Sequence, residues 1–167
     1  MGRFYRLYQL LRAITGRVSQ QEWDLVAQQL TECELVLFKR MASFDQRHCI
    51  DVYTTLVRHG YQDPTLLRAS LLHDCGKVDD NGRPIPLVYY GIFVVLQRFM
   101  PKLYTFAASK GHGIWSPFAI HDTHELRSVQ LVQVAGGSSD IVSLLQDYAD
   151  HRQTPQTYAL QWADNQN

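Results

Sequence analysis

The chain has 167 residues, of which 46% are hydrophobic and 19% are charged, and this composition is typical of a globular protein with a sizeable core. Its 16 Lys and Arg balance 16 Asp and Glu, so no overall positive field favours nucleic acid or another polyanion. The cysteines are odd in number, show no CxxC spacing and are expected to be reduced, and no apolar run has transmembrane length. We therefore expect one cytoplasmic domain.

Residues 3–18 show apolar side chains at helical spacing and carry four arginines without any acidic residue. A basic amphipathic helix of this kind can lie on an anionic membrane or dock on a partner protein. More often, such an apolar stripe covers the core of its own domain. We expect the core-covering role, with peripheral membrane or protein contact as the alternative.

Two capping-box patterns come next, S-x-x-E from position 19 and T-x-x-E from position 31. They predict short helices over 20–29 and 32–42, because the Ser or Thr and the Glu satisfy each other's backbone N–H groups. Asp45 is the expected cap of the following helix, which carries His48 and ends at Gly60.

The most informative stretch is LLHDCGK, residues 71–77. His73 and Asp74 close an apolar helix, and Gly76 stands where a left-handed C-cap is expected. Paired nitrogen and oxygen ligands suit a divalent transition metal, and Lys77 suits an anionic substrate. A buried His-Asp pair can also be a satisfied hydrogen bond in a core that holds no metal.

The second half of the chain is predicted to form further helices. Residues 76–86 are expected to form a loop. The apolar run 87–99 is expected to be a buried helix, because the chain has no second strand-like run that could pair with it. More helices are expected over 102–108, 116–135, 140–150 and 155–164. The whole chain is predicted to be an all-α single domain.

His48 lies 25 residues before His73, and this order of a His, a His-Asp pair and a distal Asp resembles the HD-domain superfamily of metal-dependent phosphohydrolases. The run His-Asp-x-Gly-Lys carries the most specific part of the resemblance, which covers about residues 44–164. It implies a single HD-type helical domain over 44–167, with helices surrounding a metal site. The helices of 1–43 would pack on or flank that core as part of one structural unit.

The resemblance also implies a ligand set of His48, His73, Asp74 and a distal Asp. We place the distal Asp at Asp164, in the Ala-Asp context that the family often shows. The alternatives are Asp147 and Asp150. Mixed His and carboxylate ligation suits Mn, Fe, Co, Ni or Zn, with Mg also open, as one ion or two.

The chemistry that follows is phosphoester hydrolysis. The metal would lower the pKa of a bound water and polarise the phosphoryl group, so that hydroxide attacks phosphorus. Asp74 and Lys77 would be the catalytic side chains, with Lys77 also binding the substrate phosphate as a point charge.

Some members of the superfamily hold a second metal through further histidines before the distal Asp. His124 opens a segment that resembles their His-Pro-x-x-Gly/Ser stretch, and His121 lies one helical turn earlier. Together with His151 they are candidates for a second metal or a substrate contact. The later histidine of those members aligns with Tyr148 instead of His151, which departs from a full binuclear pattern.

We therefore expect a phosphatase or phosphodiesterase that acts on a small phosphorylated molecule such as a nucleotide. The Gly-Tyr-Pro tripeptide of the cyclic-dinucleotide phosphodiesterases is absent, which disfavours cyclic-di-GMP as the substrate. No nucleic-acid partner is expected, and the oligomeric state is left open. The alternative function is a non-catalytic metal- or nucleotide-binding sensor or scaffold with a basic docking helix at 3–18.

Overall fold

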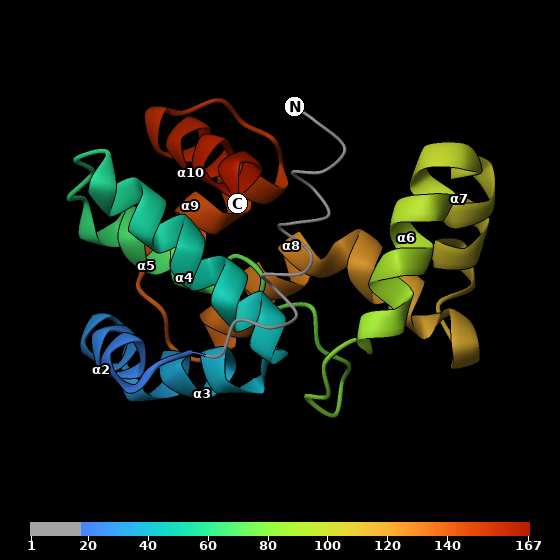
Figure 1. The fold of residues 1–167 in the computed structure, drawn as a ribbon, viewed down its shortest axis with the longest axis horizontal. Coiled ribbons are helices and arrows are strands. Elements are labelled where there is room, and N and C mark those ends of the chain that lie inside the picture. The colour runs from blue at the N-terminus through green and yellow to red at the C-terminus, as the bar shows by residue number, and fades with distance from the viewer. Residues whose placement is uncertain (1–17) are drawn as a thin grey trace.

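The structure is a computed structural model in which residues 18–167 are described, and every regular element within them is a helix (Figure 1). This confirms the all-α fold class. The elements are α2 Gln20–Gln29, α3 Glu32–Arg40, α4 Ser43–Arg58, α5 Pro64–Leu72, α6 Leu87–Phe99, α7 Pro101–Lys110, the 3₁₀ turn η1 Gly113–Trp115, α8 Ser116–Val134, α9 Ser139–Ala149 and α10 Pro155–Gln166.

The first two described helices begin where their capping boxes predict. In α3, the Thr31 hydroxyl accepts from the backbone N–H of Glu34, and the Glu34 carboxylate accepts from the Thr31 N–H at 2.9 Å. Glu34 is fully buried and accepts two further hydrogen bonds from Arg68 of α5, at 2.8 and 2.7 Å. One side chain thus caps α3 and also ties it to α5.

The described helices enclose two separate apolar cores. The larger core is built by α2 to α5, the second half of α8, α9 and α10, with α4 packed against α5 and α10. The smaller core holds Phe93 of α6, Tyr104 of α7 and Phe118 of α8. Figure 1 shows α6 and α7 together at one end of the molecule, joined to the rest along α8, which is 19 residues long.

Three local predictions are wrong, each because tertiary contacts decide the outcome. Asp45 does not cap α4, whose N-cap is Ala42; it lies inside the helix and is 3% exposed. Gly76 is not left-handed, and α5 ends with His73 as its C-cap. Within α6, Phe93 is buried while most other apolar side chains are exposed, because α7 and α8 cover only one of its faces.

The helix expected over 3–18 lies outside the described residues except for Val18, which packs against the larger core. Among residues 18–167, no helix combines the length and the apolar character needed to cross a bilayer.

Replacing Glu34 by Ala is expected to lower the free energy of unfolding by about 3 kcal/mol, because Arg68 loses its buried carboxylate partner and α3 loses part of its cap. Urea denaturation measures the change. Glu32→Ala, at an exposed position in the same first turn, is the matched control and should cost about 1 kcal/mol or less. Equal losses in the two variants would contradict the dual role of Glu34.

Candidate metal centre

Four side chains from three separate parts of the sequence converge where α4, α5 and α10 meet. His48 comes from α4, His73 and Asp74 follow α5, and Asp164 lies near the end of α10. His48 Nε2 lies 2.8 Å from Asp164 Oδ1 and 3.8 Å from Asp74 Oδ2. His73 Nε2 lies 3.7 Å from each of the same two oxygens. Two atoms bound to one ion at about 2.1 Å are separated by at most about 4.2 Å, so these pairs lie within reach of a single ion.

The ring of His73 is held with one nitrogen facing the carboxylates. Its Nδ1 donates to the carbonyl oxygen of Ser70 at 2.9 Å, which leaves Nε2 as the nitrogen directed toward Asp74 and Asp164. Nε2 is buried and has no hydrogen-bond partner among the described residues. Buried polar atoms are normally satisfied, and a metal-binding imidazole normally donates its other N–H to a carbonyl or carboxylate. His73 therefore fits the role of a ligand.

Asp74 is 2% exposed and is held ionised by its neighbours. Burial acts to raise the pKa of Asp74, but the nearby Lys77 and His73 charges hold it well below its ordinary value. Lys77 Nζ lies 2.6 Å from Asp74 Oδ2 and 3.6 Å from Asp45 Oδ1. Burial acts to lower the pKa of Lys77, yet these two carboxylates keep it well above its ordinary value. Lys77, whose side chain is 14% exposed, is thus a largely buried cation within the cluster.

The other two carboxylates of the cluster are each hydrogen-bonded by a tyrosine. Tyr148 O–H donates to Asp164 Oδ2 at 3.1 Å. Burial opposes ionisation of Asp164, but its hydrogen bond with His48 and the nearby His73 charge hold the pKa of Asp164 far below the ordinary value. Tyr90 O–H donates to Asp45 Oδ2 at 3.1 Å, and burial raises the pKa of Asp45. These contacts orient each carboxylate toward the cluster.

The charges of the cluster favour a bound cation. Asp45 and Asp74 contact Lys77, and Asp164 contacts His48, so the carboxylates outnumber the ammonium groups among the described side chains of the cluster. The negative charge of the carboxylates also acts on His73: burial lowers its pKa, but the Asp74 carboxylate raises it well above the ordinary value. A proton or a divalent ion on Nε2 can compensate this negative charge. The cluster can therefore hold a metal ion.

Cys49 also lies near this group, because its sulfur is 3.8 Å from His73 Nδ1. That nitrogen is already engaged by Ser70 O, and it lies on the opposite side of the ring from Nε2. Burial raises the pKa of the Cys49 thiol, which disfavours the thiolate that a metal binds. The set built on His48, His73 and Asp164 is the better donor set.

The second oxygen of Asp74 faces another histidine. His124 Nε2 lies 3.4 Å from Asp74 Oδ1, and His124 Nδ1 donates to the His121 carbonyl at 2.6 Å. His121 stacks on the His124 ring and contacts the Tyr104 hydroxyl through Nδ1 at 2.7 Å, and burial lowers its pKa to about 4. His151 is exposed in the turn after α9, and it is not among the described residues grouped as possible metal ligands.

The three candidates for the distal carboxylate are placed differently. Asp164 contacts both His48 and His73. Asp147 and Asp150 instead face Arg152, at 3.2 and 3.5 Å. Of the three, Asp164 is the one that the fold brings to the cluster.

The glycine of the His-Asp-x-Gly-Lys run is required by packing. A Cβ at Gly76 would lie 2.1 Å from the His124 carbonyl oxygen and 2.6 Å from the Ser128 nitrogen. The Gly76 N–H donates to Ser128 Oγ at 2.8 Å, and that hydroxyl donates to the His73 carbonyl at 2.7 Å. The backbone between His73 and Gly76 is therefore pressed onto α8, which sets the position of Asp74.

Several of these residues were not identified from the sequence. The sequence analysis predicts Asp45 as a helix cap. Its position three residues before His48, however, puts both side chains on one helix face, and this spacing could have indicated that Asp45 belongs to the site. Tyr90 reaches the cluster from α6, which no local pattern indicates. Tyr148 was noted only as the residue that aligns with a family histidine, and its hydrogen bond to Asp164 is a tertiary contact.

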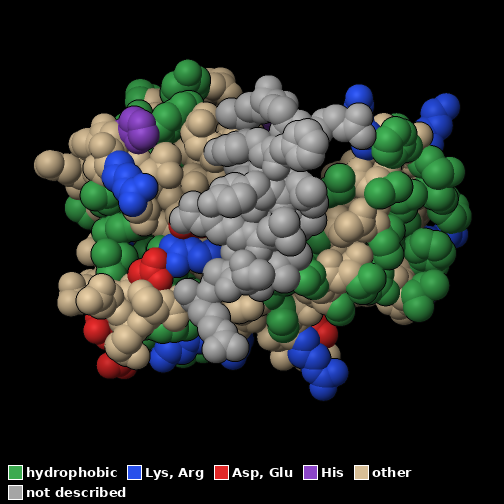
Figure 2. All heavy atoms as spheres, in the orientation of Figure 1, with side chains coloured by type: hydrophobic (Ala, Val, Ile, Leu, Met, Phe, Trp, Pro, Cys, Tyr) green, Lys and Arg blue, Asp and Glu red, His purple; other side chains and the backbone are tan. Residues whose placement is uncertain are grey.

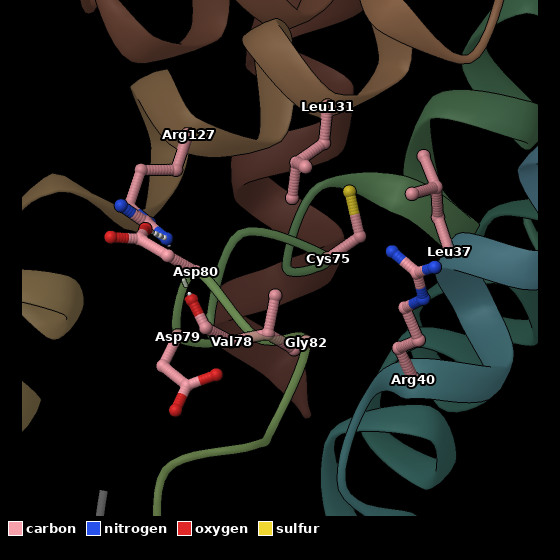
Figure 3. A pocket seen from close by; sticks show the side chains of 9 residues that line it. All are labelled: Leu37, Arg40, Cys75, Val78, Asp79, Asp80, Gly82, Arg127 and Leu131. Carbon is pink, nitrogen blue, oxygen red and sulfur yellow. Dashed lines mark hydrogen bonds and ion pairs between the residues drawn. The ribbon is translucent and has the colours of Figure 1, made fainter.

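A cavity of about 210 Å³ lies beside the loop that follows the His-Asp pair (Figure 3). Arg127 borders it and holds the loop through bonds to Gly76 O, Val78 O and the Asp80 carboxylate. Cys75 and Val78 line it, but the four candidate ligands do not, so it is separate from the cluster.

Comparisons of the chain with protein-family models, curated proteins and solved structures found no match. The interpretation of the cluster therefore rests on its geometry and charge.

Gly76→Ala is expected to lower the free energy of unfolding by about 3 kcal/mol, because the added methyl group would overlap the α8 backbone. Gly91→Ala is the matched control, since that helical position has open space around it. It should leave stability unchanged or raise it by up to about 1 kcal/mol. Thermal or urea unfolding distinguishes the two, and a Gly76→Ala variant as stable as the control would refute the packing argument.

Replacing His73 or Asp164 by Ala is expected to weaken Zn²⁺ or Mn²⁺ binding more than about a hundredfold, because loss of an outer-shell partner alone typically costs about ten- to a hundredfold. Calorimetric titration of the metal-free protein measures this, and Asp147→Ala is the control that should bind normally. Normal binding by Asp164→Ala with loss in Asp147→Ala would transfer the distal ligand to α9.

Proposed function

We propose that the protein is an HD-type metal-dependent phosphohydrolase that acts on a small phosphorylated molecule such as a nucleotide. The observation that carries the proposal is the buried, unpartnered His73 Nε2, directed at Asp74 and Asp164. A nitrogen in this environment is explained by a bound cation better than by a core hydrogen bond. The order His48, His73-Asp74, Lys77, Asp164 adds the resemblance to the superfamily.

In this proposal His48, His73, Asp74 and Asp164 hold the ion. When bound, a divalent metal supplies a Lewis acid that lowers the pKa of a coordinated water and polarises a phosphoryl oxygen. Mixed imidazole and carboxylate donors suit Mn, Fe, Co, Ni or Zn, with Mg as a further choice.

The remaining side chains orient the ligands and the substrate. Lys77 neutralises Asp74, and its ammonium has three donors, so it can also donate to a substrate phosphate oxygen. Tyr148 fixes the Asp164 carboxylate through its 3.1 Å hydrogen bond. His124, on the far oxygen of Asp74, is placed to contact the substrate or to bind a second ion, with His121 behind it.

The test is hydrolysis of phosphomonoesters, phosphodiesters and nucleotides by the full chain loaded with Mn²⁺, Fe²⁺ or Zn²⁺. Asp74→Asn should lower the rate more than about a hundredfold, since removing the ligand removes several kcal/mol of transition-state stabilisation. Lys77→Gln should lower kcat/KM as well, whereas Lys39→Gln, at an exposed position on α3, should match the wild type. Circular dichroism confirms that each variant is folded.

The outcomes separate enzyme from sensor. Turnover that requires metal and disappears in Asp74→Asn supports the phosphohydrolase. Metal-dependent nucleotide binding without turnover would replace it by the sensor or scaffold function. A protein that binds none of the three metals would overturn the phosphohydrolase and the metal sensor, and would leave a scaffold.

A further inference from the structure

The α6–α7 hairpin exposes many large apolar side chains. On α6, Val88, Ile92, Val95 and Phe99 follow each other at helical spacing and are 67, 39, 53 and 75% exposed. Figure 2 shows hydrophobic side chains gathered at the end of the molecule formed by α6 and α7. We call this surface the hairpin face, and its exposed members are Val88, Ile92, Val94, Val95, Phe99, Met100, Leu103, Phe106 and Ile114.

The hairpin face is not the remainder of an incomplete core. The inner sides of the same helices already build the smaller core around Phe93 and Tyr104. Isolated exposed apolar residues are common on soluble proteins, but a contiguous group of aliphatic and Phe side chains marks an interaction surface. The length of α6, 13 residues, allows it to lie along a surface and not to span a bilayer.

The charged residues of the segment that forms the hairpin have one sign. Between Asp80 and Asp122 the sequence contains no acidic residue, although the whole chain has equal numbers of acidic and basic residues. The same segment carries four basic residues, Arg83, Arg98, Lys102 and Lys110. Lys102 and Lys110 are exposed on α7, and Arg98 is exposed on α6. A hairpin that exposes apolar side chains and whose own charged residues are all basic is complementary to a bilayer surface, in which an apolar region lies below an anionic layer.

This charge pattern decides between the candidate occupants. A second copy packed through the same face would bring the cations of the two hairpins together without any acid in the segment to pair them. Residues 1–17 would meet the same difficulty, because they contain four arginines and no acid. An anionic bilayer fits both the basic charges and the apolar side chains of the hairpin. Its phosphates pair with the cations, and its acyl region accepts the apolar side chains of the hairpin face.

We propose that the hairpin face docks on the surface of an anionic lipid bilayer. The stripe of α6 and the exposed side chains of α7 and Ile114 enter the boundary between headgroups and acyl chains. Arg98, Lys102 and Lys110 contact lipid phosphates at the rim. This inference does not depend on catalysis by the metal cluster.

The test is co-sedimentation of the full chain with vesicles. The protein is expected to bind vesicles of phosphatidylcholine mixed with phosphatidylglycerol, to bind phosphatidylcholine alone far more weakly, and to be partly released by high salt. The double variant Val88→Asp, Val95→Asp should lower the partition coefficient on the order of a hundredfold, because two aliphatic side chains that become buried in the bilayer are lost. Arg98→Gln, Lys102→Gln, Lys110→Gln together should lower it by a similar factor, at about fivefold per charge.

Matched control variants change the same residue types elsewhere on the surface. Val36→Asp with Val134→Asp alters two valines that are 48 and 88% exposed on α3 and α8. Lys39→Gln with Arg58→Gln removes exposed charges from α3 and α4. Both controls should bind vesicles like the wild type, and thermal melts confirm that all variants are folded.

Three results would overturn the proposal. The first is absence of binding to anionic vesicles. The second is vesicle binding that survives both hairpin variants and disappears when Arg3, Arg6 and Arg12 are neutralised, which would assign the contact to the N-terminal segment. The third is a dimer in sedimentation velocity that dissociates in the Val88→Asp, Val95→Asp variant, together with no vesicle binding, which would assign the face to a second copy.

Discussion

Asp74 is a carboxylate with 2% exposure, and a buried carboxylate is stable only when surrounding groups compensate its charge. Lys77 lies 2.6 Å from one of its oxygens, and His124 lies 3.4 Å from the other. His48 and His73 approach at 3.8 and 3.7 Å, so α4, α5, α8 and the loop after α5 all contribute to this balance. Side chains from several helices thus neutralise this one buried charge, and a divalent ion would add to that neutralisation.

The backbone around this carboxylate is as constrained as its charge. Gly76 approaches α8 so closely that no Cβ fits, and Ser128 joins the two segments by a pair of hydrogen bonds. Glycine at this position therefore serves close packing, and the lysine that follows it is turned back onto Asp74 as a result. The spacing of the His-Asp-x-Gly-Lys run thus has a geometric reason independent of any metal.

The hairpin of α6 and α7 is connected to this cluster without sharing its core. Tyr90 reaches from α6 to Asp45, and Tyr104 reaches from α7 to His121, which stacks on His124. The inner faces of the hairpin thus contact the polar centre while the outer face remains apolar and exposed. A molecule that is neutral overall therefore has a hairpin whose own charged residues are all basic, because its acidic residues lie outside the segment between Asp80 and Asp122.

Local patterns were enough to predict those features that depend on neighbours in the chain. The helices α2 and α3 begin directly after the capping residues Ser19 and Thr31, as expected, and the run 87–99 is helical over its whole length. Both predictions succeed because capping and helical periodicity depend on residues only a few positions apart. Asp164 was identified only through a family resemblance. The burial of Asp45, the hydrogen bonds of Tyr90 and Tyr148, and the exposure of α6 depended on how helices pack across long sequence separations. No local pattern encodes which face of a helix a distant partner covers, and for this reason the tertiary structure decided them.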